Sequence, residues 1–169
     1  DAVAPHLKDE ARALAVPFLA EADGPERALR INSPRSAAGL RDLLAVIEAR
    51  PARGVLFLPK VSSAEEVAWV DELLSETGLS LDLAVLIESV VGLERVSSIL
   101  PASPRIAFAM FGAADLSAEL GVPLAHEPLL YARSRVVHAA KLAGIDVFDV
   151  PSLAFRDLEQ VAREADLAR

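Results

Sequence analysis

Two acidic side chains, Glu88 and Asp115, stand at or just after the ends of apolar segments and lie 27 residues apart (115 − 88). This interval is about one strand-and-helix unit, so neighbouring parallel strands would bring both carboxylates to the same edge of a sheet. Mg²⁺ keeps several waters and takes one or two protein carboxylates. The pair therefore predicts a magnesium site. A second interpretation stays open, in which Glu88 is a helix cap or rim charge and Asp115 caps a short helix.

Two cationic side chains and one further acid occupy similar positions. Arg30 lies inside an apolar run, where an unpaired guanidinium is costly to bury, so we expect it to face an oxyanion of a substrate or of the protein. Lys60 follows Pro59 at the end of the next run, where lysine is also commonly just solvated. Asp149 ends the last run, where an Asp also starts turns readily. These residues predict a charged set at the ends of apolar strands.

The elements that must position this set are five short apolar runs that alternate with longer amphipathic stretches, a pattern that predicts βα units and a parallel sheet. The runs are nearly continuous in Val, Ile, Leu and Phe, which is typical of strands covered on both faces. The expected strands are Ala28–Asn32, Gly54–Lys60, Leu83–Glu88, Arg105–Gly112 and Ile145–Val150. The expected helices are Pro5–Glu21, Ala37–Arg50, Ala64–Thr77, Val90–Leu100, Glu127–Leu142 and Ala154–Ala168.

Local signals mark some of the helix ends. Ser63 stands before Ala64-Glu65-Glu66, and a hydroxyl at the N-cap followed by carboxylates in the first turn suits the helix dipole. Gly78 and Gly144 each follow an amphipathic stretch, where a residue that tolerates positive φ commonly ends a helix. They predict the points at which the chain turns back toward the next strand.

Composition excludes several classes of function. The 169 residues carry a formal charge of −8 and no block of Lys or Arg, so nucleic acid and anionic membranes are not expected partners. No apolar run approaches the roughly 20 residues of a membrane helix. The chain has no cysteine, which excludes disulfides and thiolate chemistry and suits a cytoplasmic location. Signatures of serine hydrolases, dinucleotide dehydrogenases and P-loop proteins are absent. The aromatic side chains, Trp69 and Tyr131 among them, are too scattered for a stacking platform and fit core packing better.

Six short pieces of the sequence resemble, as an ordered set, the citrate lyase beta-subunit-like branch of the HpcH/HpaI aldolase/citrate lyase family. Each piece alone is a weak signal, but six in the family's order make a strong one, and together they cover nearly all of the chain. The pieces are Asp1-Ala-Val-Ala-Pro5, Arg30-Ile-Asn32, Leu58-Pro-Lys-Val61, Leu86-Ile-Glu-Ser89 with Gly92, Phe111-Gly-Ala-Ala-Asp-Leu116 and Tyr131-Ala-Arg133.

The resemblance implies an α/β fold of the TIM type, a (β/α)8 barrel, with Mg²⁺ as cofactor and Mn²⁺ as the alternative. The metal ligands would be Glu88 and Asp115. Family members cleave or form a carbon–carbon bond in 3-hydroxy-acid thioesters such as citryl-, malyl- or citramalyl-CoA. The chain is thus expected to be a metal-dependent carbon–carbon lyase. The alternatives are a class II aldolase acting on pyruvate-derived hydroxy acids, and a non-catalytic paralogue or assembly subunit.

The resemblance also implies roles for other residues. Arg30 would contact the carboxylate or carbonyl oxygen of the substrate and act in catalysis, and Asn32, Lys60 and Glu88 would line the same substrate site. Asp1 would belong to the catalytic set, ordering a metal-bound water. The family's acidic residue before this Asp, and an Arg-bearing loop after the family's first strand, have no counterpart here, so the general base is not assigned.

The number of expected strands is small for a whole barrel. A (β/α)8 domain typically needs about 250 residues, whereas five strands are expected in this chain of 169 residues, which opens inside a family motif. We therefore expect residues 1–169 to be one barrel domain that is incomplete at both ends, without its first and closing strands. Family resemblance further implies a homo-oligomer, with a trimer favoured, in which a neighbouring subunit covers the site.

Overall fold

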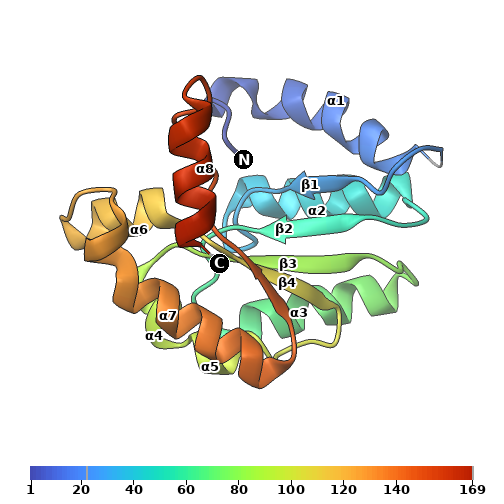
Figure 1. Ribbon diagram of the computed structural model, residues 1–169. Helices are drawn as coiled ribbons and strands as arrows, with labels where there is room; N and C mark the ends of the chain where they lie inside the picture. Colours follow the sequence, from blue (N-terminus) through green and yellow to red (C-terminus); the bar gives the residue numbers. More distant parts are fainter. Residues whose placement is uncertain (22, 169) are drawn as a thin grey trace.

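A parallel sheet of five strands forms the centre of the computed structural model, which describes residues 1–21 and 23–168. The strands follow one another across the sheet in the order β1-β2-β3-β4-β5, and each pairs with its neighbour in parallel (Figure 1). They are β1 (Ala28–Arg30), β2 (Val55–Leu58), β3 (Asp82–Ile87), β4 (Ile106–Phe111) and β5 (Asp146–Phe148). All five predicted strands are therefore confirmed, with somewhat shorter bounds than the apolar runs.

Helices connect the strands, so that every strand runs in the same direction. They are the short 3₁₀ turn η1 (Pro5–Leu7), α1 (Lys8–Ala20), α2 (Ala37–Ala49), α3 (Ala64–Glu76), α4 (Val90–Glu94), α5 (Val96–Ile99), α6 (Ala113–Leu120), α7 (His126–Ala143) and α8 (Leu158–Leu167). Since all crossovers run alike, the carboxyl ends of the five strands meet at one edge of the sheet. Within the described residues, none of the helices has the length and apolar character that a membrane span requires.

Three helices differ from their predicted extent, the first being Pro5–Glu21, which opens as the 3₁₀ turn η1 and becomes α-helical only at Lys8. The predicted helix Val90–Leu100 is interrupted at Arg95, which separates α4 from α5. The helix predicted from Ala154 begins only at Leu158, where Asp157 caps it through a bond from the Gln160 amide. A further helix, α6, follows β4 after Gly112 and has no counterpart among the predicted helices, except in the short-helix alternative for Asp115.

The predicted cap residues lie at the expected helix ends, but one of them does not form the predicted hydrogen bond. Gly144 ends α7 in the left-handed conformation, with φ of 75°, and Gly78 follows Thr77, the C-cap residue of α3, with φ of 70°. Ser63 does occupy the N-cap position of α3, but its side chain accepts no cap hydrogen bond. The neighbouring Ser62 hydroxyl instead donates to the Glu66 carboxylate at 2.7 Å. The side-chain contact at the start of α3 therefore comes from Ser62, one residue before the predicted Ser63.

The core is densest around β3, where Leu83 to Ile87 are all buried. This strand lies between β2 and β4 and matches the expectation of a strand covered on both faces. In contrast, β1 and β5 have only one half-buried residue each between exposed neighbours. The expectation was therefore wrong for the two outer strands, because their positions at the sheet edges leave them with one strand neighbour each.

An aromatic ladder crosses one face of the sheet. Phe57, Phe108 and Phe148 stack edge to face, with ring centroids 5.3 Å and 4.8 Å apart. The small side chain of Ala84 is in register between Phe57 and Phe108, which allows the two rings to meet across β3. The prediction of core packing for the aromatics is wrong for Trp69, which is 41% exposed, and for Tyr131, which is 69% exposed and accepts a hydrogen bond from Arg135.

Candidate active site

Glu88 follows the last residue of β3 and is almost completely buried, with 8% of its surface exposed. Its side chain lies against Gly112, the residue that follows β4. A β-carbon at position 112 would stand 3.0 Å from Glu88 Oε2 and 3.1 Å from Glu88 Cα, and would overlap Glu88 Cβ. Glycine is therefore required at position 112 for close approach, and the two strand ends hold the Glu88 carboxylate between them.

The electrostatic surroundings of Glu88 bring in the other predicted site residues. Burial raises the pKa of the Glu88 carboxyl, and the Asp115 carboxylate raises that pKa further. A hydrogen bond from the Lys60 amide and the charges of Lys60 and Arg30 act in the opposite direction. Glu88 thus experiences Asp115, Lys60 and Arg30 at once, as expected for side chains gathered at one edge of the sheet.

Lys60 connects the two carboxylates. Its backbone N–H donates to Glu88 Oε1 at 2.8 Å, and its ammonium lies 3.4 Å from Asp115 Oδ2. Lys60 has a positive φ of 55°, a conformation that costs a residue with a side chain roughly 1 kcal/mol or more. This turn at the end of β2 directs the amide toward Glu88, while the side chain, 61% exposed, extends toward Asp115.

Asp115 lies in the first turn of α6, with its side chain 53% exposed. It makes no cap: the N-cap residue of α6 is Gly112, and no side chain caps the helix. The alternative of a simple capping role is therefore not what the geometry shows. A carboxylate in the first turn of a helix is favoured by the helix dipole, and here it faces the Lys60 ammonium beside Glu88.

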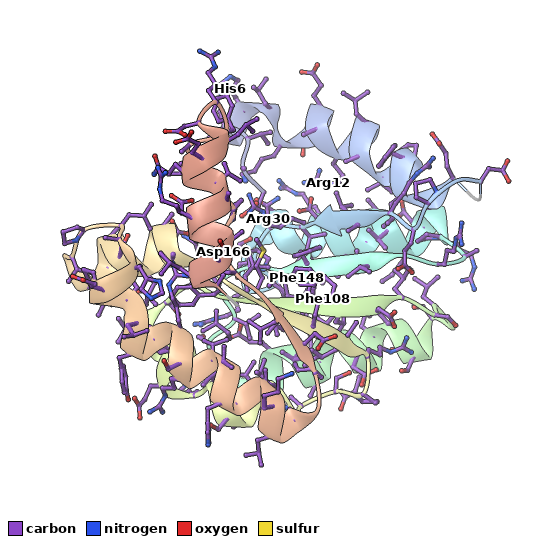
Figure 2. All side chains as sticks on the ribbon, viewed as in Figure 1. His6, Arg12, Arg30, Phe108, Phe148 and Asp166 are labelled. Carbon is purple, nitrogen blue, oxygen red and sulfur yellow. The ribbon has the colours of Figure 1, made fainter. Side chains whose placement is uncertain are left out.

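Arg30 ends β1 and is paired with Asp1. Arg30 Nε donates to the Asp1 carboxylate, and the backbone nitrogen of Asp1 lies 3.0 Å from the carbonyl oxygen of Arg30. The Arg30 side chain is 44% exposed, so part of the guanidinium can reach a ligand. A hollow of about 190 Å³ lies here, lined by both residues and by Lys8, Arg12, Asn32 and Asp42 among others. Figure 2 shows Arg12 reaching from α1 toward β1 and Arg30.

Asn32, two residues beyond β1, is buried and engaged at both ends of its amide. The carbonyl oxygen accepts from the Lys8 ammonium, and the amide nitrogen donates to Asp42 at 2.6 Å. The predicted contact between Asn32 and a substrate is therefore not evident in this geometry. Sequence reasoning missed Lys8, Arg12 and Asp42, although a signal existed for Asp42, which falls on the buried face of α2 with Gly39, Leu43 and Val46.

Asp149, just beyond β5, pairs with Arg133 of α7, whose guanidinium also lies 5.1 Å from the centre of the Phe111 ring. A cleft of about 390 Å³ adjoins this pair, between α7 and α8, and its lining includes neither Glu88 nor Asp115. The hollow beside Arg30 is likewise lined by neither carboxylate. We therefore place the candidate site at the charged side chains that surround Glu88, which are Asp115, Lys60 and Arg30, and not at either cavity.

The ligand set suits a hard cation. Across residues 1–21 and 23–168, no group of three or more His, Asp and Glu side chains is arranged to hold a metal. Mg²⁺ does not require one, because it binds through one or two carboxylates and retains its waters. Glu88 and Asp115 supply two carboxylates. The Glu88 carboxylate is buried and hydrogen-bonded, the Asp115 carboxylate is exposed, and both are ligands of the kind that Mg²⁺ takes.

Comparisons with known proteins find relatives that match nearly the whole of this chain. The model of the HpcH/HpaI aldolase/citrate lyase family matches residues 1–169. The mitochondrial citramalyl-CoA lyase of Homo sapiens is 31% identical over 98% of this chain and 54% of its own length. The citrate lyase subunit beta of Haemophilus influenzae is 32% identical over 100% of the chain and 61% of its own length. The chain thus spans about half to three fifths of these relatives.

Two solved structures show the same fold. RipC from Yersinia pestis superposes with a TM-score of 0.86 at 34% identity, over 99% of this chain and 76% of that one. CitE from Mycobacterium tuberculosis, in complex with magnesium and acetoacetate, gives 0.80 at 28% identity, over 98% and 66%. The five parallel strands with their helices therefore belong to the TIM-type barrel architecture of these proteins.

Proposed function

We propose an activity from one established premise: this chain belongs to the HpcH/HpaI aldolase/citrate lyase family. The proposed activity is that of a Mg²⁺-dependent carbon–carbon lyase that cleaves or forms 3-hydroxy-acid thioesters of the citryl-, malyl- or citramalyl-CoA type. One observation carries the proposal above the others. Lys60 contacts both proposed cation ligands: its N–H donates to the buried Glu88 at 2.8 Å, and its ammonium lies 3.4 Å from Asp115. Arg30 ends the adjacent strand β1, so an anion-binding guanidinium stands at the same edge of the sheet.

The metal assignment rests on the carboxylates of this chain and on its relatives. We assign Glu88 and Asp115 as the protein ligands of Mg²⁺, with Mn²⁺ as the alternative ion. Solved structures of CitE from Mycobacterium tuberculosis, 28% identical to this chain, contain magnesium together with acetoacetate, acetate or pyruvate. When bound, the cation supplies Lewis-acid polarisation of a carbonyl oxygen.

The reaction needs stabilisation of charge on oxygen. In the cleavage direction the hydroxyl proton on C3 leaves and the C2–C3 bond breaks. The electron pair moves onto the thioester carbonyl oxygen as an enolate, C3 becomes the carbonyl of a second product, and C2 is then protonated. A guanidinium that is already positioned beside the oxygen where this negative charge develops stabilises the transition state. We assign this role, or the binding of a substrate carboxylate, to Arg30, whose planar fork can hold two oxygens.

The remaining site residues support or extend this set. We propose that Asp1 holds Arg30 in the orientation seen in its ion pair, as part of the catalytic set, and orders a metal-bound water. Lys60, with its long exposed side chain, is the proposed second contact to substrate anions. Glu88 stays a predicted substrate contact, at a part of the substrate other than its anionic groups. Asn32 stays a predicted substrate contact, although its amide is already engaged by Lys8 and Asp42.

Three further predictions concern the whole protein. We propose that residues 1–169 form one domain, which is supported by a single buried cluster that includes residues of α1, every strand except the two outermost, and α7. We also propose a homo-oligomer, with a trimer favoured, on family resemblance. A cytoplasmic location stays a prediction that suits a chain without cysteine.

A thioester screen tests the proposed function. The protein is incubated with citryl-, malyl- and citramalyl-CoA, with Mg²⁺ or with a chelator, while release of an acyl-CoA and a keto acid is measured. We expect turnover of at least one thioester that requires Mg²⁺ and that the variant Glu88→Gln lacks. Cleavage of free hydroxy-keto acids but of no thioester would indicate the aldolase alternative. Mg²⁺ binding without turnover of either class would indicate a non-catalytic paralogue.

A further inference from the structure

Asp42 is a buried acid for which the proposed reaction has no direct use. It lies on α2, is 6% exposed, and its carboxylate accepts three hydrogen bonds. Oδ2 accepts from the backbone N–H of Asn32 at 2.7 Å and from the Asn32 side-chain amide at 2.6 Å, and Oδ1 accepts from Arg12 Nε at 2.7 Å. A buried carboxylate is costly unless it is paired and bonded in this way, so the cluster fixes its members firmly.

The contacts continue from Asp42 to the proposed catalytic guanidinium. The carbonyl oxygen of the Asn32 side chain accepts from the Lys8 ammonium, which also donates to the backbone carbonyl of Asp1 at 3.1 Å. The Asp1 carboxylate in turn accepts from Arg30 Nε. The order of contact is therefore Asp42, Asn32, Lys8, Asp1 and Arg30.

Backbone packing restricts Asn32, the first residue in contact with Asp42 in this series. Gly39, in the first turn of α2, lies so close to the segment after β1 that a β-carbon there would stand 2.7 Å from the Asn32 carbonyl oxygen. Asn32 is therefore held by α2 through its backbone and through Asp42. On the other side, Arg12 Nη2 is buried without a hydrogen-bond partner within the described residues, so Arg12 relies on its bonds to Asp42 and to the exposed Asp9.

Arg30, at the other end of this series of contacts, is held less firmly than Asn32. The Arg30 guanidinium pairs with the Asp1 carboxylate, and the Arg30 side chain is 44% exposed. A guanidinium must be oriented as well as present if it is to hold two oxygens of a substrate. Its orientation then depends on how firmly Asp1 is held, and Asp1 is held by Lys8 and by the Arg30 backbone.

We propose that Asp42 is a positioning residue for the proposed lyase reaction, which acts through Asn32, Lys8 and Asp1 to fix the direction of the Arg30 guanidinium. Asp42 touches no reacting atom in this account. The inference rests on the proposed function of Arg30. It explains why a charged side chain occupies the buried face of α2, where an apolar residue would pack without the cost of burying a charge.

The kinetic test is a double-mutant cycle on Asp42 and Arg30 in the full chain with Mg²⁺. Asp42→Asn keeps the shape of the side chain. We expect it to lower kcat about 10- to 100-fold, the range typical of residues that orient a functional side chain through hydrogen bonds without contacting the substrate. In the Arg30→Lys background the same change should cost less than about threefold, because lysine has no planar fork to orient. Losses that multiply in full would overturn the proposal.

A matched control separates positioning from stability. Asp71 on α3 accepts a comparable set of bonds, from Ser103 at 2.8 Å and Arg105 at 2.6 Å, but lies near the amino ends of β3 and β4. Asp71→Asn should lower the thermal midpoint as Asp42→Asn does, yet leave kcat within about twofold of wild type. Equal losses of kcat in both variants would assign Asp42 a structural role only. If Asp42→Asn fails to fold, Lys8→Met interrupts the same contacts outside the core.

A spectroscopic readout is independent of the reaction. In ¹⁵N-labelled protein the Nε–H of Arg30 should be protected from solvent exchange by Asp1, and Asp42→Asn should speed that exchange at least tenfold while Asp71→Asn does not. An Arg30 signal unchanged in Asp42→Asn would contradict the proposal, whether or not the protein cleaves a thioester. If wild type shows no lyase activity but Arg30 responds to Asp42→Asn, the proposed function fails and the positioning contact stands.

Discussion

Gly112→Ala is the substitution that most sharply separates the candidate metal site from the fold. The added β-carbon would stand 3.1 Å from Glu88 Cα, about 0.4 Å inside the closest favourable carbon–carbon separation of roughly 3.5 Å. The overlap with Glu88 Cβ is more severe, so Glu88 must move by at least this amount. Gly112 has an ordinary negative φ of −91°, and therefore the substitution introduces no backbone strain of its own.

The expected consequence is a loss of metal affinity that exceeds the loss of stability. Metal–oxygen distances in proteins tolerate displacements of only about 0.2 Å, which is half of the minimum shift. We expect Gly112→Ala to weaken Mg²⁺ binding on the order of 10- to 100-fold. Overpacking at this position should lower the free energy of unfolding by about 1–3 kcal/mol. Titration calorimetry with Mg²⁺ measures the first quantity, and urea denaturation measures the second.

Gly54→Ala is the control for this prediction. Gly54 precedes β2, at the amino end of the sheet, and a β-carbon there would lie 2.8 Å from Leu19 Cδ1 and 2.9 Å from the Arg27 carbonyl oxygen, at a φ of 137°. This variant should be destabilised at least as much as Gly112→Ala, but its folded form should bind Mg²⁺ with wild-type affinity. Unchanged Mg²⁺ affinity in Gly112→Ala, or an equal loss in Gly54→Ala, would refute the placement of the metal beside Glu88.

Three further predictions follow from the same contacts. Burial raises the Glu88 pKa above its ordinary value of 4.5, so the folded protein binds more protons than the unfolded one between the two values. Stability should therefore fall as the pH rises through this window, and Glu88→Gln should remove that slope in urea denaturation while abolishing Mg²⁺ binding. Arg30→Lys should lower kcat/KM at least tenfold with Mg²⁺ affinity unchanged, because the ammonium cannot hold two oxygens. Arg50→Gly, at the left-handed end of α2 with φ of 46°, should stabilise the protein by about 0.5–1 kcal/mol.

Each of these predictions has its own control. A pH slope that persists in Glu88→Gln would show that another group produces it. Wild-type turnover by Arg30→Lys would show that the guanidinium is not needed. For Arg50→Gly the converse change is Gly144→Ala at the end of α7, where a β-carbon meets nothing within 4 Å and only the φ of 75° opposes it. That variant should lose about 1 kcal/mol, and two neutral changes would contradict the strain argument.

The strands and the charged residues at their ends could be predicted from the sequence for a physical reason. Parallel strands are apolar throughout, so Glu88 and Arg30 stand out where each apolar run ends. Asp115 was predicted from its interval of 27 residues after Glu88, but a capping role was equally open until the family resemblance was added, because Asp115 lies in the first turn of α6 and not at a strand end. The role of Gly112 itself depends on the distance between two strand ends, which no local pattern reports.

The hydrogen bonds that hold the site residues in place were harder to predict, because they join segments that are distant in the sequence. Lys8 and Arg12 of α1 meet Asn32 and Asp42 only once α1 packs beside β1 and α2. The one local signal was an acid on the apolar face of α2. Likewise the partial exposure of β1 and β5 depends on which strands lie at the edges of the sheet, and the composition of those strands does not encode it.

A crystal structure of the protein with Mg²⁺ would decide whether Glu88 and Asp115 share one cation. We expect one ion bound to carboxylate oxygens of both residues at about 2.0–2.1 Å, with the Lys60 ammonium displaced from Asp115 and the Arg30 guanidinium facing the same edge of the sheet. An ion bound elsewhere, or the two carboxylates pointing apart with no ion between them at saturating Mg²⁺, would contradict this expectation.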